Sequence, residues 1–189
     1  AYLPPLGETY FDLNTFSRKS YFEDEKEYDA ELSNVKYSNI LKLPYNLKGF
    51  FEYEEALRYS KKNNKPMLLD FTGHGCVNCR DIESRVWPDQ RVRDYLNNKY
   101  VLVSLYVDDK TQLPEKDWYT SNYDSKIKKT IGKQNADFQI TRFNNNAQPF
   151  YVVIDPFSEK IIYRPWGYEL NVESYISHLE NGISKFYEE

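Results

Sequence analysis

Two cysteines stand three residues apart in the stretch DFTGHGCVNCRDIE, residues 70–83, and the chain has no others. The apolar run PMLLDFT that leads into them is typical of a buried strand. The run CVNCRDIESRVW that begins at Cys76 is predicted to be a helix, which Pro88 interrupts or bends. Cys76 and Cys79 therefore lie where a buried strand passes into a helix. A C-x-x-C pair of this kind is a signal of redox chemistry or of metal binding.

Hydrophobic periodicity and turn residues predict the other elements of the chain. In chain order, these are a helix over residues 52–64, a helical stretch over 91–99, a strand over 100–107, a helix within 125–143, two strands over 148–156 and 160–167, and a helix over 171–189. The nearly continuous apolar character of YVLVSLYV predicts a central position for the strand over 100–107. Asn171 is the expected N-cap of the last helix. The order of the elements indicates an α/β sheet that ends in an antiparallel hairpin.

The length and the charge of the chain limit its organisation and its partners. A chain of 189 residues is long enough for one domain with a sizeable core and an extension. The acidic run SYFEDEKEYDAE, residues 20–31, is typical of a solvated surface. Residues 1–45 are therefore predicted to be an extension or linker, and residues 46–189 the domain. The net charge of −4 argues against nucleic acid as a partner. Because the chain begins at Ala1 rather than Met, we expect a mature product or an excised domain.

The position of the cysteine pair favours redox chemistry. The N-terminus of a helix carries partial positive charge and free N–H groups, which stabilise a thiolate at Cys76. Cys79, one turn later, is placed to resolve a mixed disulfide, so Cys76 is the predicted nucleophile and Cys79 the resolving thiol. Zinc needs about four ligands, and the chain offers only these two cysteines, His74 and the distant His178. We therefore expect no metal site.

The strand, the C-x-x-C pair, the helix and the elements that follow resemble the thioredoxin fold. The stretches KPMLLDFTGHGCVNCRDIESRVW, VLVSLYVDD and NNNAQPFYVVIDP resemble more closely the C-terminal thioredoxin-like domain of DsbD-type thiol:disulfide interchange proteins. The resemblance covers roughly residues 48–180. It implies an α/β thioredoxin fold, with a central mixed sheet flanked by helices, an N-terminal extension, and an insertion before the strand that follows a cis proline.

In that family a membrane-embedded domain supplies electrons, and this domain passes them to a second periplasmic domain or to other thioredoxin-like proteins of the envelope. The resemblance therefore implies a protein-disulfide reductase in the periplasm or cell envelope, tethered to the inner membrane in the full-length protein. It implies no cofactor besides the redox-active disulfide Cys76–Cys79, no nucleic acid and no metal. Two alternatives remain open, a free-standing exported thioredoxin-like reductase and a non-catalytic thioredoxin-fold binding module.

Two acids match positions that this family places beside its cysteines. Asp70, six residues before Cys76, matches a buried acid at the end of the strand. Glu83, four residues after Cys79, matches a second acid on the same helix face, the alternative being an ordinary surface position. A buried, unpaired carboxylate is costly, so the pKa of Asp70 is expected to be raised. We expect Ser104 opposite Asp70 on the neighbouring strand, where some thioredoxins have a lysine. Both acids should oppose the ionisation of Cys76 and make it less reactive than in thioredoxin.

Four further residues are expected to contact the partner protein. Pro149 matches the proline that follows a cis peptide bond and faces the active site in thioredoxin-like proteins. Gln148 stands before it, where many relatives have Thr or Ile, and Gly75 stands where thioredoxins have Trp. His74 either tunes Cys76 or is a solvated loop residue.

The polar segment over residues 108–146 is longer than the connection in a minimal thioredoxin. Its WYTSNY stretch, residues 118–123, is expected either to dock a partner or to pack on the core. Lys126, Lys128, Lys129 and Lys133 are expected to form one solvated helix face.

Overall fold

The computed structural model describes residues 34–188 of the chain. The chain divides into two units after Val35, and all helices and strands of the described part lie in the second unit, residues 36–189. Most of the predicted extension over residues 1–45 lies outside the described residues, so its boundary at residue 45 stays a prediction.

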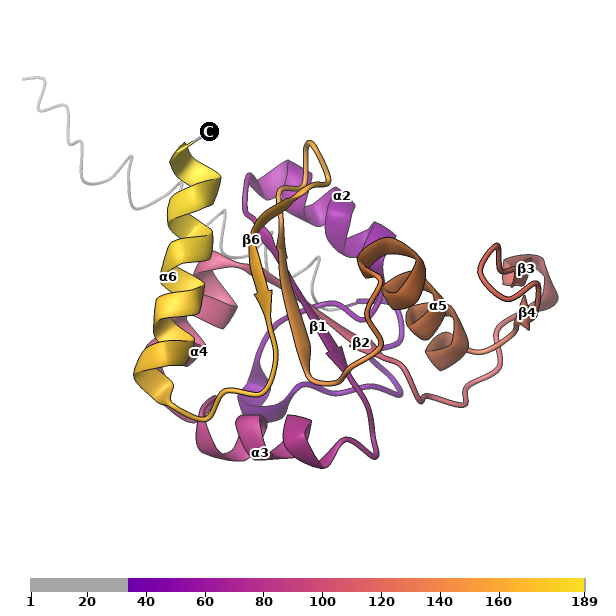
Figure 1. Ribbon diagram of the computed structural model, residues 1–189, viewed down its shortest axis with the longest axis horizontal. Coiled ribbons are helices and arrows are strands. Elements are labelled where there is room, and N and C mark those ends of the chain that lie inside the picture. The colour runs from indigo at the N-terminus through magenta and orange to yellow at the C-terminus, as the bar shows by residue number, and fades with distance from the viewer. Residues whose placement is uncertain (1–33, 189) are drawn as a thin grey trace, which may run out of the picture. The chain divides into compact units, whose positions relative to one another are not determined.

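The second unit alternates helices and strands (Figure 1), and η marks a short turn of another helix type. In chain order, the elements are η1 (Pro44–Asn46), α2 (Tyr53–Asn63), β1 (Met67–Thr72), α3 (Val77–Arg85), α4 (Gln90–Asp94), η2 (Tyr95–Lys99), β2 (Val101–Tyr106), η3 (Glu115–Asp117), β3 (Tyr119–Thr120), β4 (Ile127–Lys128), α5 (Ile131–Phe143), β5 (Phe150–Ile154), β6 (Ile161–Trp166) and α6 (Val172–Glu188). Within the described residues, none of the helices combines the length and the apolar character needed to cross a membrane.

Four strands form one mixed sheet in the order β2–β1–β5–β6. β1 pairs in parallel with β2 and antiparallel with β5, and β5 and β6 form the predicted antiparallel hairpin. The expectation that β2 is central is wrong, because β2 lies at one end of this order. β2 is nevertheless buried along its whole length. The backbone of Phe50 covers its outer edge, through hydrogen bonds of 2.8 Å to Leu102 O and 2.9 Å from Ser104 N.

Helices cover both faces of this sheet (Figure 1). α2 and α5 lie on one face, where Phe138 of α5 contacts Tyr53 of α2 and Phe71 of β1, with ring centroids 4.9 and 6.1 Å apart. α3, α4 and α6 lie on the other face. Because side chains alternate along a strand, Asp70 points away from Phe71 and into this second face.

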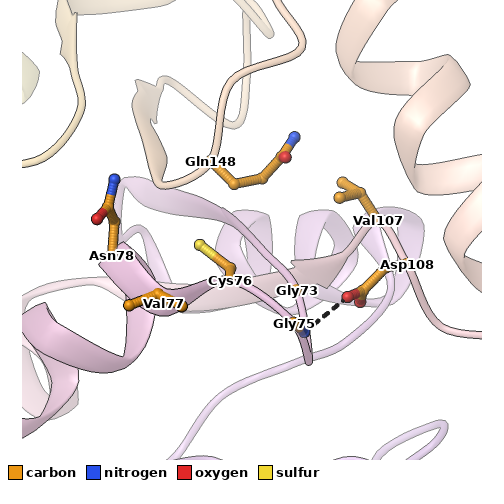
Figure 2. Close-up of a pocket in the computed structure, with 8 residues that line it drawn as sticks. All are labelled: Gly73, Gly75, Cys76, Val77, Asn78, Val107, Asp108 and Gln148. Atoms are coloured by element: carbon orange, nitrogen blue, oxygen red, sulfur yellow. Dashed lines mark hydrogen bonds between the residues drawn. The ribbon is translucent and has the colours of Figure 1, made fainter.

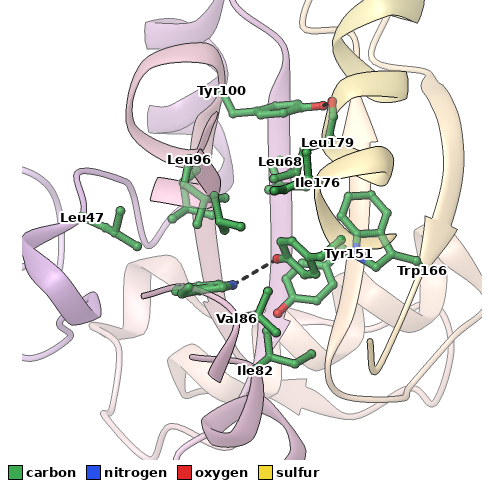
Figure 3. Packing of buried hydrophobic residues seen from close by; sticks show 14 of the residues in the cluster. Leu47, Leu68, Ile82, Val86, Leu96, Tyr100, Tyr151, Trp166, Ile176 and Leu179 are labelled. Atoms are coloured by element: carbon green, nitrogen blue, oxygen red, sulfur yellow. Dashed lines mark hydrogen bonds between the residues drawn. The ribbon is translucent and has the colours of Figure 1, made fainter. Parts of the chain in front are cut away.

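The second face carries a large buried cluster of apolar side chains (Figure 3). Its members are Leu47, Leu68, Ile82, Val86, Trp87, Val92, Leu96, Tyr100, Leu102, Tyr151, Val153, Trp166, Tyr175, Ile176 and Leu179. Burying one such side chain contributes about 1.5–3 kcal/mol. Trp87 Nε1 donates a hydrogen bond of 3.1 Å to Tyr175 Oη, and Tyr100 Oη donates one of 2.7 Å to Leu179 O. These bonds fix α6 against the residue that precedes β2 and against the segment that follows α3.

Local sequence signals set the ends of the helices. The side chain of Glu52 caps α2 by accepting a hydrogen bond of 2.8 Å from the backbone N–H three residues on. Asn64 ends the same helix in the left-handed conformation, with φ of 49°. Pro88 separates α3 from α4, as predicted. Asn171 caps α6 through its Oδ1, which confirms the expected N-cap.

The insertion over residues 108–146 contains the hairpin β3–β4, followed by α5. The expectation that four lysines share a helix face is wrong, because Thr130 caps α5 and residues 126–129 precede it. Lys128 lies in β4, with its Nζ 2.8 Å from Asp124 Oδ2 and 3.4 Å from Asp137 Oδ1. Its side chain therefore ties the hairpin to α5.

The residues of the WYTSNY stretch, which was expected either to dock a partner or to pack on the core, differ in their contacts. Trp118 Nε1 donates a hydrogen bond of 2.7 Å to Leu113 O, and Tyr119 Oη donates one of 3.0 Å to Asp137 Oδ2. Both side chains therefore hold the insertion together. Tyr123 is 66% exposed beside the hairpin turn, and a docking role for it stays a prediction.

Candidate redox site

Cys76 and Cys79 form a disulfide at the start of α3, with their Cα atoms 5.3 Å apart. Cys76 is the N-cap of the helix, and its Sγ accepts a hydrogen bond of 3.2 Å from the backbone N of Cys79. Cys79 is 2% exposed, whereas Cys76 is only partly buried. Cys76 is therefore the sulfur that an external disulfide can reach, which fits the predicted order of the two thiols.

Asp70 lies on β1, the strand that leads into the redox loop. It is 1% exposed and pairs in register with Ser104 of β2, whose Oγ donates a hydrogen bond of 2.8 Å to Asp70 Oδ2. Burial raises the pKa of the Asp70 carboxyl to about 7; the hydrogen bond from Ser104 and the charge of Arg80 lower it, and the charge of Glu83 adds to the rise. The predicted burial, the partner on β2 and the direction of the pKa shift are confirmed.

Glu83, one turn after Cys79 on α3, is also buried. Its Oε1 lies 2.7 Å from Nη2 of Arg80, which also donates a hydrogen bond of 2.9 Å to Thr72 Oγ1. Burial raises the pKa of Glu83, and the charge of Arg80 opposes this rise. Glu83 is therefore a buried acid, and the alternative of an ordinary surface position is wrong.

The peptide bond between Gln148 and Pro149 is cis, as predicted. The loop that carries it is held by Gln139 of α5, a residue with no exposed surface. Gln139 Nε2 donates a hydrogen bond of 2.8 Å to Ala147 O, and Gln139 Oε1 accepts one of 2.9 Å from Gln148 Nε2. Gln139 was not among the residues predicted from the sequence. The feature that points to Gln139 is a glutamine at a buried position of a helix, because a buried polar side chain needs hydrogen-bond partners.

A second residue of the site that was not predicted, Asp108, lies just after the end of β2. The carboxylate of Asp108 accepts hydrogen bonds of 2.8 Å from the backbone N–H groups of both His74 and Gly75. A Cβ at Gly73 would stand 3.0 Å from this carboxylate, so the lack of a side chain at Gly73 leaves space for Asp108. Asp108 therefore fixes the redox loop from the neighbouring strand. The feature that could have predicted this contact is the parallel pairing of β1 with β2, which brings the ends of the two strands together.

His74 is exposed in the loop, but its ring is held in place. Its Nε2 lies 2.8 Å from Asp109 Oδ2, and its ring packs on Tyr106 with centroids 4.7 Å apart. Burial acts to raise the pKa of Asp109, but hydrogen bonds from His74 and Thr111 outweigh it and lower this pKa. These contacts tie His74 to the end of β2, and its effect on Cys76 stays a prediction.

An open cavity of about 380 Å³ lies beside Cys76 (Figure 2). Its lining includes Gly75, Cys76, Val77, Asn78, Asp108 and Gln148. Figure 2 shows the sulfur of Cys76 pointing towards the side of the cavity on which Gln148 lies. The structure thus brings Cys76, Gly75 and Gln148 together at one surface. Pro149 is buried next to this surface, and His74 is exposed in the adjoining loop.

The described residues contain no group of three or more His, Cys, Asp or Glu side chains that could hold a metal ion. His178, the distant histidine of the sequence, stacks on Trp166 with ring centroids 4.9 Å apart. Its Nδ1 lies 3.2 Å from Tyr163 Oη. His178 therefore packs against β6, distant from the two cysteines in sequence.

In this structure a helix starts at a C-x-x-C disulfide, and a cis proline precedes a strand of a mixed sheet. This is the arrangement of thioredoxin-fold proteins. The thioredoxin-like family profile matches residues 48–156, more than half of the chain. The protein therefore belongs to the thioredoxin-like family.

Solved structures of similar fold include an oxidoreductase named DsbH, which is 20% identical, with a TM-score of 0.54 over 80% of this chain and 93% of that one. A thioredoxin from Thermus thermophilus is 19% identical, with a TM-score of 0.49 over 70% of this chain and 84% of that one. The oxidised C-terminal domain of Neisseria meningitidis DsbD is 11% identical, with a TM-score of 0.47 over 68% of this chain and 90% of that one. At these identities the likeness concerns the fold alone. Among curated proteins, no sequence matches this chain.

Proposed function

We propose that this protein is a thiol–disulfide oxidoreductase that reduces disulfides of other proteins in the bacterial cell envelope. The Cys76 thiolate attacks a partner disulfide, and Cys79 then attacks the mixed disulfide, so that the partner leaves as a dithiol. One observation carries the proposal. The accessible sulfur of Cys76 is bonded to the buried Cys79, and two buried acids, Asp70 and Glu83, lie on the strand and the helix that hold the pair.

The buried acids favour reduction of the partner over its oxidation. A carboxylate near a thiol makes the thiolate more costly. Strongly oxidising proteins of this chemistry are oxidants because their reduced form is stabilised. The N-terminus of α3 stabilises a thiolate at Cys76, and we expect Asp70 and Glu83 together to outweigh it. The reduced protein then gives up its electrons readily.

Asp70 also provides a proton acceptor inside the protein. Because burial raises its pKa to about 7, both its protonated and its ionised forms are populated near neutral pH. Cys79 must lose its proton before it attacks the mixed disulfide. A buried group whose pKa lies near the working pH is suited to take that proton. We assign this role to Asp70.

The proposed electron donor is a membrane-embedded domain, and the proposed clients are thioredoxin-like or DsbD-type domains with exchangeable disulfides. The support for both is the resemblance of residues 65–87, 101–109 and 144–156 to the C-terminal domain of DsbD-type proteins. The proposal places the protein in the periplasm or cell envelope, tethered to the inner membrane in the full-length protein. The redox-active disulfide Cys76–Cys79 is the only redox group that the reaction needs.

Reduction of insulin disulfides, with dithiothreitol as the electron source, tests the proposed activity. The wild-type protein should accelerate the reduction well beyond the rate with dithiothreitol alone, and Cys76→Ser should abolish this acceleration. Ser84→Ala, a substitution on the same helix at an exposed position, serves as the control and should keep the wild-type rate. A wild-type protein that adds nothing to the dithiothreitol rate would contradict the proposal and favour a non-catalytic binding module.

A further inference from the structure

The cavity beside Cys76 (Figure 2) has one charged side chain among the described residues that line it, that of Asp108. The polar side chains of Asn78 and Gln148, which also line it, are uncharged amides. A partner segment that brings its disulfide to Cys76 therefore enters beside a negative charge.

Asp108 is held in one position by its surroundings. Each of its carboxylate oxygens accepts a backbone hydrogen bond of 2.8 Å, one from His74 and one from Gly75. The segment that carries it is fixed from behind by α5, because Gly132 N donates a hydrogen bond of 3.0 Å to Asp109 O. A Cβ at Gly132 would stand 2.5 Å from Asp109 N, so the two backbones are in direct contact. The negative charge is therefore part of a fixed wall of the cavity.

Two charged side chains of the neighbouring segments, those of Asp109 and Arg80, are engaged elsewhere. The carboxylate of Asp109 is 10% exposed and lies 2.8 Å from His74 Nε2. Arg80 lies with its Nη2 2.7 Å from Glu83 Oε1. None of these side chains is part of the described lining of the cavity, so the charge that a partner meets there is that of Asp108.

We propose that Asp108 determines which disulfides Cys76 accepts: it disfavours disulfides flanked by carboxylates and favours those flanked by neutral or cationic groups. This inference rests on the proposed function, because it requires Cys76 to react with an external disulfide. In that reaction, the Cys76 thiolate bonds to one sulfur of the partner, the partner's S–S bond breaks, and the other sulfur leaves as a thiolate that takes a proton from water. Cys79, after losing its proton, displaces the first sulfur. The protein dithiol is thereby oxidised to a disulfide, and the partner disulfide is reduced to two thiols.

Negative charge is present in the cavity that Asp108 lines throughout the first step, since it passes from the Cys76 thiolate to the leaving sulfur. A carboxylate on the partner adds repulsion from Asp108, whereas an ammonium group is attracted to it. For groups several ångströms apart in water, one such pair changes a rate by roughly threefold, and salt screens it over a Debye length of about 10 Å.

Three small disulfides that differ in charge test this inference: cystamine, which carries ammonium groups, hydroxyethyl disulfide, which is neutral, and dithiodiglycolate, which carries carboxylates. The reduced protein is freed of reductant and mixed with each probe, and the rate at which the Cys76–Cys79 disulfide forms again is measured. Each rate with a charged probe is divided by the rate with hydroxyethyl disulfide, so that changes in the reactivity of Cys76 itself cancel. Comparing each variant with the wild type on the same probe removes the intrinsic reactivity of that probe.

Asp108→Asn should raise the relative rate with dithiodiglycolate and lower that with cystamine, each by roughly threefold at low ionic strength. Asp108→Glu keeps the charge and should keep the wild-type preference. Asp94→Asn removes one exposed negative charge on α4, outside the lining of this cavity, and should leave both relative rates at their wild-type values.

Relative rates that stay unchanged in a folded Asp108→Asn protein would overturn the inference and leave the proposed function standing. If that variant does not fold, the salt dependence of the wild type decides. As salt is added, the relative rate of the wild type should rise with dithiodiglycolate and fall with cystamine, because salt screens the charge of Asp108. Relative rates that are independent of salt would also overturn the inference. A wild-type protein that reacts with none of the three probes would overturn the proposed function, and this inference with it.

Discussion

Ser104 Oγ donates a hydrogen bond of 2.8 Å to Asp70 Oδ2, between two adjacent parallel strands of the sheet. This bond gives the carboxyl one partner, but burial still dominates and raises the pKa of Asp70 to about 7. A serine hydroxyl satisfies hydrogen-bonding capacity without supplying a positive charge. The pairing therefore leaves Asp70 poised between its neutral and charged forms on the strand that leads to the cysteines, and the predictions for this residue follow from that state.

Replacing Asp70 by Asn should stabilise the fold, and more so at neutral than at acid pH. Because the pKa of Asp70 is raised in the folded protein, the folded state binds this proton more tightly than the unfolded chain does. The carboxyl therefore costs no stability below about pH 4 and destabilises the fold increasingly as the pH rises towards 7. Each unit of pKa difference is worth about 1.4 kcal/mol, so the free energy of unfolding of the wild type should fall by a few kcal/mol relative to Asp70→Asn.

Urea unfolding of both proteins, from about pH 4 to about pH 8, measures this difference. Asp94→Asn, at an exposed position of α4, is the matched control and should show no such trend. A difference between Asp70→Asn and wild type that does not change with pH would show that Asp70 ionises alike in the folded and unfolded states.

Removing the charge of either buried acid should make Cys76 react faster with an alkylating reagent at neutral pH. The thiolate fraction rises about tenfold for each unit by which the pKa of a thiol falls. Both Asp70→Asn and Glu83→Gln should therefore move the pH dependence of alkylation of the reduced protein to lower pH. Turnover with a protein disulfide should nevertheless fall in Asp70→Asn, because an amide cannot take the Cys79 proton. An unchanged pH dependence in Asp70→Asn would leave Glu83 as the only acid that tunes the site.

The two cysteines should behave differently when each is replaced by serine. Cys79→Ser should accumulate a mixed disulfide with a partner through Cys76, because the buried resolving thiol is gone. Cys76→Ser should form no adduct, since the thiol that remains is 2% exposed in the structure. Mass spectrometry of the trapped complexes identifies the linked residue. An adduct on Cys79 of the reduced wild-type protein, with Cys76 unmodified, would reverse the two roles.

Gln139→Met should slow exchange with protein disulfides more than exchange with hydroxyethyl disulfide. The substitution removes the hydrogen bonds to Ala147 O and from Gln148 Nε2, so the loop beside Cys76 loses its anchor on α5. With about 1 kcal/mol for each bond, the free energy of unfolding should fall by about 2 kcal/mol.

Gln134→Met provides a matched control on the same helix. Gln134 Nε2 donates hydrogen bonds to Asp117 O and Lys128 O, which lie in the insertion. This variant should lose a similar amount of stability and keep the wild-type rate with insulin. Equal losses of insulin reduction in both variants would assign Gln139 to stability alone.

The parts of the site that lie in one continuous stretch could be predicted from the sequence. Asp70, Cys76 and Cys79 occupy one strand, one loop and one helix, so local periodicity and spacing were enough to place them. The cis bond before Pro149 and the burial of Glu83 were expected from a family resemblance, and the structure has both.

The parts that depend on tertiary pairing could not be predicted in the same way. Asp108 holds a loop that is distant in sequence, and Gln139 holds the loop that follows its own helix. A single sequence does not state which groups meet either side chain. The central position expected for β2 was wrong because an apolar strand can be buried at the edge of a sheet when another segment covers that edge, as Phe50 does here. The lysines of the insertion were misplaced because Thr130 starts α5 later than their spacing suggested.

The reduction potential of the Cys76–Cys79 pair tests the central claim most directly. The protein is equilibrated with buffers of known ratio of reduced to oxidised dithiothreitol or glutathione, and the fraction of disulfide is measured after acid quenching and alkylation. Because Asp70 and Glu83 oppose the thiolate that would stabilise the reduced form, the potential should lie near that of thioredoxin, about −270 mV. A potential near that of the strongly oxidising members of this chemistry, about −120 mV, would contradict a reductant and reverse the proposed direction of electron flow.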